Sequence, residues 1–151
     1  MSTLKERIAQ DYKRAMLARD AFVVETLSGI KAAILNEEVA KGVRDTGLAD
    51  EQIEQLLVRE AKKRDEAAEL FAKGGREESA AKERAEKQLI ARYLPEQMDE
   101  AAVQAVIDAV IVELQPEGPK DMGRVIGAVK AKTGSAADGA LIARLVKAKL
   151  S

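Results

Sequence analysis

Residues 50–75 read DEQIEQLLVREAKKRDEAAELFAKGG, and this stretch decides the fold class. Its apolar residues recur every three or four positions, which places them along one face of an α-helix. Most of the other residues are Glu, Lys, Arg, Gln and Ala, which all form helices readily. Asp50 is expected to cap the start of this helix, and Gly74 with Gly75 to end it. The inward positions are Ile53, Leu57, Ala61, Ala68 and Phe71.

The same start and stop signals recur along the chain and predict six further helices. Thr3 and Glu6 form a capping-box pattern. Aromatic residues make up only 3% of the chain, and no stretch alternates apolar and polar residues as a half-buried strand does. The predicted fold class is therefore all-α. The seven helices are expected to begin near Thr3, Asp20, Asp50, Arg76, Asp99, Pro119 and Asp138.

A change of character at residues 94–96 predicts two domains. Four longer helices with many charged residues precede Pro95, and three short helices with apolar stripes follow it. Proline ends the helix before it and suits a connection between domains. We therefore expect a four-helix N-terminal domain at residues 1–95 and a three-helix C-terminal domain at residues 96–151.

The composition excludes several kinds of active site. The chain contains neither cysteine nor histidine, so it has no disulfide, no thiolate nucleophile and no histidine base or metal ligand. Ser28 lies within a predicted helix and has no histidine to activate it. We expect no catalytic residue, no metal and no cofactor. No stretch approaches the roughly 20 apolar residues of a membrane span, and the first residues lack the apolar core of a secretory signal. The expected location is cytoplasmic, without a membrane partner.

The net charge of −1 hides a polarised C-terminal third. Residues 1–95 carry as many bases as acids. Residues 96–118 carry six acids and no base, whereas residues 119–151 carry seven bases and two acids, a net charge of +5. A cluster of bases of this kind is typical of a surface that attracts phosphate groups.

The predicted sixth helix carries two glycines on its polar face. Helical spacing places Met122, Val125, Ile126 and Val129 on one face and Gly123 with Gly127 on the other. An exposed glycine inside a helix costs about 1 kcal/mol relative to alanine, so something must approach this face closely. Either another helix of the same protein packs there, or an anionic ligand such as an RNA backbone lies on a flat strip flanked by basic residues. The flanking bases are Lys120, Arg124 and Lys130.

Other charged groups have simpler interpretations. Residues 62–64 form the densest basic run, but acids at helical spacing surround it, which favours ion pairs within the helix. Glu37 and Glu38 are expected to be an exposed, solvated pair at a helix end. Arg144 and Lys147 lie three residues apart on the polar face of the seventh helix, where they either are solvated or extend the basic surface of the sixth helix.

The chain resembles the GatB/YqeY family. The resemblance is carried by residues 120–129, which read KDMGRVIGAV, and by Gly134, residues 137–139 and residues 145–147. It continues upstream in residues 4–7, 32–34, 36–38, 75–77 and 93–95, which look like the stand-alone YqeY-type proteins. Amidotransferase tails often carry Asn-Pro where this chain has Ala137 and Asp138, so the chain resembles the free-standing branch.

The resemblance implies a C-terminal domain similar to the tail of the GatB component of aspartyl/glutamyl-tRNA amidotransferase, a part that contacts tRNA. The domains that perform the chemistry of that enzyme have no counterpart in this sequence. The leading hypothesis is thus a non-catalytic accessory protein that binds tRNA or another structured RNA. The alternatives are a helical module that binds a protein through its N-terminal helices, and a component of a glutamine-dependent carbon–nitrogen ligase. The expected RNA-binding residues are Lys120, Gly123, Arg124, Gly127, Lys130, Arg144 and Lys147.

Overall fold

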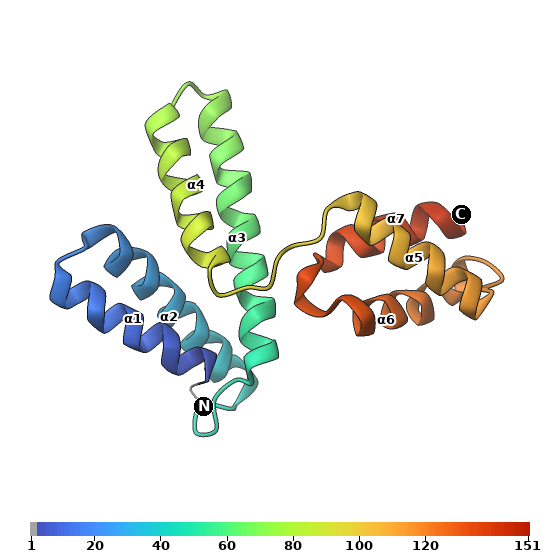
Figure 1. Ribbon diagram of the computed structural model, residues 1–151, viewed down its shortest axis with the longest axis horizontal. Helices are drawn as coiled ribbons and strands as arrows, with labels where there is room; N and C mark the ends of the chain where they lie inside the picture. The colour runs from blue at the N-terminus through green and yellow to red at the C-terminus, as the bar shows by residue number, and fades with distance from the viewer. Residues whose placement is uncertain (1–2) are drawn as a thin grey trace. The chain divides into compact units, whose positions relative to one another are not determined.

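A computed structural model describes residues 3–151, and these residues form seven α-helices and two short 3₁₀ helices without any β-strand (Figure 1). The all-α prediction is confirmed. The α-helices are α1 (Leu4–Ala18), α2 (Ala21–Lys41), α3 (Asp50–Lys73), α4 (Glu77–Ala91), α5 (Glu100–Leu114), α6 (Met122–Thr133) and α7 (Gly139–Leu150). The 3₁₀ helices are η1 (Pro119–Asp121) and η2 (Gly134–Ala136).

The chain divides into two compact units, Met1–Leu94 and Pro95–Ser151. This division is compatible with the two domains expected from the sequence. The first unit contains α1 to α4 and the second contains α5 to α7, and each has a hydrophobic core of its own.

The core of the first unit lies where two helix pairs meet. Ile53 and Leu57 near the start of α3 and Ile90 near the end of α4 are almost fully buried. They pack with apolar residues of α1 and α2, namely Leu4, Ile8, Leu27, Ile30 and Ile34. The remaining parts of α3 and α4, residues 62–88, extend beyond this core as an antiparallel pair, which we call the α3–α4 arm (Figure 1).

The α3–α4 arm is held by small buried residues and by ion pairs. Ala68 in α3 and Ala80 in α4 are almost completely buried, and such small side chains let two helices approach closely. Arg64 in α3 reaches Glu60 of the same helix at 2.5 Å and Glu86 of α4 at 3.3 Å. An ion pair within α3 is therefore present as expected, and a second pair, which the sequence did not predict, joins α3 to α4.

Asp50 does not cap its own helix, contrary to the sequence prediction. The N-cap of α3 is Ala49, whose N–H donates to the side chain of Gln52 at 2.9 Å. The Asp50 carboxylate instead accepts a hydrogen bond from the N–H of Leu4 at 3.0 Å. The first N–H groups of a helix lack partners within the helix, and Asp50 satisfies one of these at the start of α1.

Glu38 is buried, and the expectation of a solvated Glu37–Glu38 pair was wrong. Glu38 is only 1% exposed, and it follows Ile34 by one helical turn on the inner face of α2. Its two carboxylate oxygens accept hydrogen bonds from the Lys5 ammonium at 2.8 and 3.1 Å, and one also accepts from the N–H of Leu48 at 3.0 Å. The loop between α2 and α3 folds back over it, and a Cβ at Gly47 would lie 3.2 Å from its Oε2.

In the second unit, α5, α6 and α7 surround a core rich in valine and isoleucine. Val103 and Ile107 of α5, Val125 and Val129 of α6 and Ile142 of α7 are completely buried. Asp99 and Asp138 cap α5 and α7 as predicted, because their carboxylates accept from the N–H groups of Ala102 and Ala140. The buried valines of α6 fix its rotation, so its opposite face points outward.

Candidate nucleic-acid interface

The outward face of α6 carries both glycines that the sequence singled out. Gly123 and Gly127 are exposed, and so is Lys130 further along the same face. The buried Val125 and Val129 lie on the opposite side of the helix. This arrangement agrees with the helical spacing of the sequence, which separates the apolar stripe from the glycine strip.

The two glycines are not required for packing within the second unit. A Cβ added to Gly123 or to Gly127 would meet no atom within 4 Å. Neither residue has a positive φ angle, so no backbone conformation demands glycine. Of the two interpretations of this face, close packing by another helix therefore finds no support among α5, α6 and α7.

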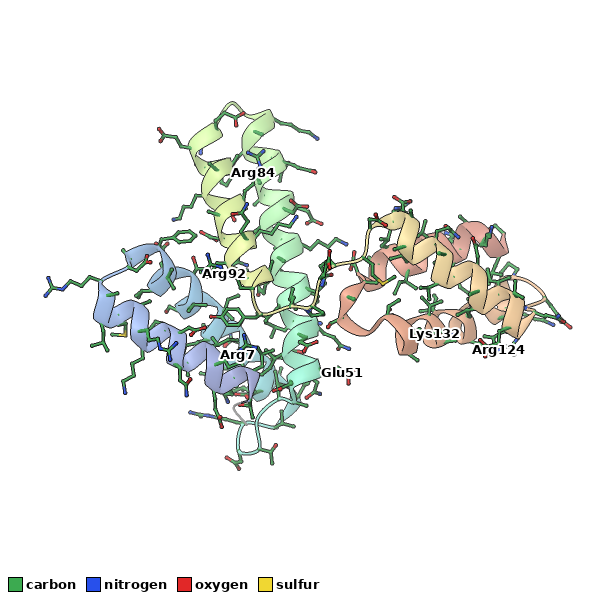
Figure 2. The ribbon with its side chains drawn as sticks, in the orientation of Figure 1. Arg7, Glu51, Arg84, Arg92, Arg124 and Lys132 are labelled. Atoms are coloured by element: carbon green, nitrogen blue, oxygen red, sulfur yellow. The ribbon has the colours of Figure 1, made fainter. Side chains whose placement is uncertain are left out.

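Three basic residues flank the glycine strip. Lys120 in η1 forms an ion pair with Glu117 at 2.6 Å, and both side chains are more than 70% exposed. The guanidinium of Arg124 lies 3.9 Å from a carboxylate oxygen of Asp121, and its Nη2 donates to the carbonyl of Leu114 at 3.4 Å. Figure 2 labels Arg124 near the start of α6. An exposed pair such as Lys120–Glu117 contributes about 0–1 kcal/mol, and at 3.9 Å the Arg124–Asp121 pair is long, so both cations can exchange their acids for a phosphate.

Lys130 lies at the junction of α6 and α7. Its Cε and Nζ atoms would each lie 3.5 Å from a Cβ placed on Gly139, the first residue of α7. The Lys130 side chain therefore lies against the first turn of α7, at an ordinary contact distance. Lys130 forms no ion pair within residues 3–151, so its ammonium group is available to a ligand. No local signal in the sequence indicates this contact, because the two residues lie on different helices.

Arg144 and Lys147 lie on α7, and no hydrogen bond or ion pair between described residues joins them to the glycine strip. The guanidinium of Arg144 pairs with Glu100 of α5 at 3.3 Å. Lys147 is exposed, and its backbone carbonyl accepts a hydrogen bond from the Ser151 hydroxyl. Their contribution to an RNA-binding surface stays a prediction.

The polarised charge of the sequence is partly neutralised between helices. The acid-rich α5 pairs with the base-rich helices that follow it, through Glu113 with Lys132 and Asp108 with Lys149, both at 3.3 Å. Figure 2 labels Lys132 on α6. A hydrogen bond from the Gln104 side chain lowers the pKa of Asp108, and the interaction with Lys149 lowers it further, although partial desolvation acts in the opposite direction. The net charge of +5 on segment 119–151 therefore overstates the positive charge available to a ligand, and Lys130 is the cation of the glycine strip without an ion pair in residues 3–151.

Among the described residues there is neither a cluster of metal-binding side chains nor a helix that could cross a membrane. Residues 3–151 contain no group of three or more acidic, cysteine or histidine residues placed to hold a metal ion. In the same part of the chain, no helix combines the length and apolar character needed to cross a membrane.

Comparison with known proteins relates the chain to one family and to a mitochondrial relative. Residues 5–150 match the family model of the YqeY-like proteins. Altered inheritance of mitochondria protein 41, mitochondrial, from Eremothecium gossypii is 33% identical over 87 residues. This match covers 58% of the chain and 46% of the relative. Because the family model spans both units, from α1 to the end of α7, the chain belongs to the YqeY-like family.

Proposed function

We propose that this protein is a non-catalytic accessory protein that binds the sugar–phosphate backbone of tRNA or another structured RNA on the outward face of α6. The observation that carries the proposal is the exposure of Gly123 and Gly127 with no atom near their missing side chains. Glycine costs helix stability here without serving the packing of the unit, and a ligand that must approach the backbone explains its presence.

The charges around the strip favour an anionic ligand. Lys130 has no acidic partner within residues 3–151, Lys120 forms only an exposed ion pair, and the exposed guanidinium of Arg124 lies 3.9 Å from the half-buried Asp121. Phosphate contacts by such residues give affinity through release of counterions and carry no base specificity. The described aromatic residues are all in the first unit, so stacking on bases by the second unit is not part of the proposal.

The likeness of residues 120–147 to the tRNA-contacting tail of the amidotransferase GatB component supports RNA as the anion. The proposal assigns this chain no step of the carbon–nitrogen ligase chemistry, and it places the protein in the cytoplasm. Release of ammonia from glutamine by the purified chain would favour the ligase alternative instead.

The first test measures the salt dependence of RNA binding. Filter binding of an unmodified tRNA transcript is followed as a function of salt for the wild type, the double variant Lys120→Glu/Arg124→Glu and the single variant Lys130→Glu. Each lost phosphate contact should reduce the log–log slope by about 0.7–0.9. The matched control is Lys132→Glu, which changes the same charge on another side of α6. Equal slopes for Lys130→Glu and Lys132→Glu would exclude this face as the RNA site.

The second test separates close approach from charge. Gly127→Leu adds a bulky side chain to the strip without changing any charge, and we expect it to weaken RNA binding about tenfold, or about 1.4 kcal/mol. Gly29→Leu is the control, because Gly29 of α2 is likewise exposed and its Cβ would meet no atom within 4 Å. Unchanged affinity of Gly127→Leu would contradict the proposal even if the charge variants weaken binding.

A further inference from the structure

Helix α2 is apolar on two sides, although only one of them faces the core. Leu27, Ile30 and Ile34 are buried in the first unit. Leu35 and Val39 lie on the outer side and are 43% and 58% exposed. An apolar face on each side of a helix is typical of a helix that is covered on both sides.

Exposed apolar residues are concentrated on the first helix pair. Among the described residues, six large apolar side chains are exposed, and four of them belong to α1 or α2. These four are Met16, Leu17, Leu35 and Val39. Single exposed apolar residues are normal on a protein surface, whereas a contiguous group marks a binding surface. Helical spacing places Met16, Leu35 and Val39, but not Leu17, on the same side of this helix pair.

A groove of about 310 Å³ runs between α1 and α2 on this outer side. Its accessible lining is almost entirely apolar, and it is partly open to solvent. The floor is formed by Ile8 and Ala9 of α1 and by Ala32, Ile34 and Leu35 of α2.

The apolar surface continues beyond this groove in both directions. Met16 follows Ala9 by two helical turns on the same side of α1, and Val39 follows Leu35 by one turn on α2. Helices α1 and α2 run antiparallel (Figure 1). Helical spacing therefore places Met16 and Val39 beyond opposite ends of the groove. From Lys5 to Met16 the distance along α1 is about 16 Å, which matches about three turns of a bound helix.

The charged groups that line the groove leave it with a positive rim. Glu38 is the acid among them, and both of its oxygens are already bonded to Lys5. Lys31 lies with its ammonium group 4.2 Å from the centroid of the Tyr12 ring and forms no ion pair within residues 3–151. One uncompensated cation therefore borders an apolar floor.

We propose that this groove binds an amphipathic helix of a partner protein, with an apolar stripe on the groove floor and acidic residues beside Lys31. The groove between two antiparallel helices accommodates a third helix, as in other helix-in-groove complexes. The positive charge of Lys31 at the rim favours a partner helix with acidic rather than basic residues beside its apolar stripe. This interface lies in the first unit and is independent of the RNA proposal for α6.

The proposal is tested with two labelled helical peptides of about five turns, both with leucine at i, i+4, i+7 and i+11. One carries glutamate on both flanks of the leucine stripe and the other carries lysine. Fluorescence anisotropy with the full chain should show the acidic peptide binding at least about tenfold more tightly than the basic one. Leu35→Glu should abolish this binding and Lys31→Glu should remove the preference. Leu70→Glu, which changes an exposed leucine of the α3–α4 arm, should have no effect.

Four outcomes overturn the proposal. They are absence of peptide binding, equal affinity for the two peptides, unchanged binding by Leu35→Glu, and self-association of the wild type that Leu35→Glu abolishes in sedimentation experiments. The last outcome would show that a second copy of the chain occupies the groove. Circular dichroism of each variant checks that the exposed substitutions leave the helices folded.

Discussion

The hydroxyl of Tyr93 donates a hydrogen bond to Oδ2 of Asp11 at 2.5 Å and so joins the turn after α4 to α1 across 82 positions of the sequence. Tyr93 is only 8% exposed, and the guanidinium of Arg7 lies 5.6 Å from the centroid of its ring. Burial raises the pKa of the Tyr93 hydroxyl far above its usual value of 10, and the neighbouring carboxylate of Asp11 raises it further. The contact fixes the last turn of the first unit before the chain enters the second.

Tyr93→Phe should destabilise the first unit by about 1.5 kcal/mol, because it removes a hydrogen bond to a charged acceptor and leaves the ring in place. The raised pKa of Tyr93 also makes this contribution to stability depend on pH. The native state holds the tyrosine proton more tightly than the unfolded state does, so this contribution is complete below pH 10 and is lost as the pH rises above it. Urea unfolding at neutral and alkaline pH measures both effects. The variant should lose less stability above pH 10 than the wild type, and Tyr12→Phe serves as the control.

Glu38 should make the first unit sensitive to acid. Hydrogen bonding from Lys5 lowers the pKa of this carboxyl from its usual 4.5, and the effect exceeds the opposing effect of burial. Because the folded-state pKa lies below the unfolded value, the contribution of Glu38 is complete above about pH 4.5 and is lost as the pH falls through the folded-state value. Glu38→Gln should cost about 2 kcal/mol at neutral pH and reduce the acid slope of the unfolding free energy.

Lys5→Met is the matched variant for the acid prediction. Without the ammonium group, the largest cause that lowers the pKa of Glu38 is gone while burial still raises it, so this pKa rises. The destabilisation caused by Lys5→Met should therefore become smaller as the pH falls and Glu38 is protonated. If the difference from the wild type stays constant between pH 7 and pH 3, the ion pair is not the source of the pH dependence.

Gly127→Ala should stabilise the second unit by about 0.5–1 kcal/mol, because alanine favours the helix and the added Cβ meets no neighbour. Gly123→Ala should give a smaller gain, since Gly123 lies in the first turn of α6. Thermal unfolding followed by circular dichroism measures both. Gly139→Ala is the comparison variant: Gly139 is the first residue of α7, where alanine gains little helix stability, and its Cβ would make only an ordinary contact with Lys130 at 3.5 Å. A loss of stability in Gly127→Ala would mean that the glycine does serve the fold.

Arg19 and Gln115 each hold a left-handed backbone conformation at a helix end, with φ angles of 57° and 47°. This conformation costs a residue with a side chain about 1–2 kcal/mol, whereas glycine adopts it freely. Glycine also gives the unfolded chain more freedom, so Arg19→Gly and Gln115→Gly should each stabilise the protein by about 0.5–1 kcal/mol net. Denaturant unfolding measures the gain. The contrasting variant Leu17→Gly, inside α1, should be destabilising.

The helices could be predicted from the sequence because their signals are local. Thr3, Asp20, Asp99 and Asp138 cap the helices that the sequence assigns to them. Asp50 shows where local reasoning fails, since its carboxylate binds the N–H of Leu4, which is distant in sequence. Glu38 was misplaced for the same reason, because its burial depends on Lys5 and on a loop that folds back over α2.

The candidate RNA site could be predicted in part. Helical spacing placed Gly123 and Gly127 on the polar face of α6, and the structure leaves them exposed. The spacing could not show that α5 supplies acids to Lys132, Lys149 and Arg144, because those pairs form between helices. The sequence raised protein binding by the N-terminal helices as an alternative, but it could not locate the groove between α1 and α2, because the walls come from two helices and the sequence assigned Leu35 no role.

The α3–α4 arm is the part of the first unit that is most open to attack by proteases. Residues 62–88 contribute no side chain to the buried core of the first unit, so the arm can open without exposing that core. At its tip, Gly74 and Gly75 form an exposed turn between the two helices. A protease that cuts at this turn would produce two fragments, and the packing of Ile53 and Leu57 with Ile90 would still hold them together after cleavage.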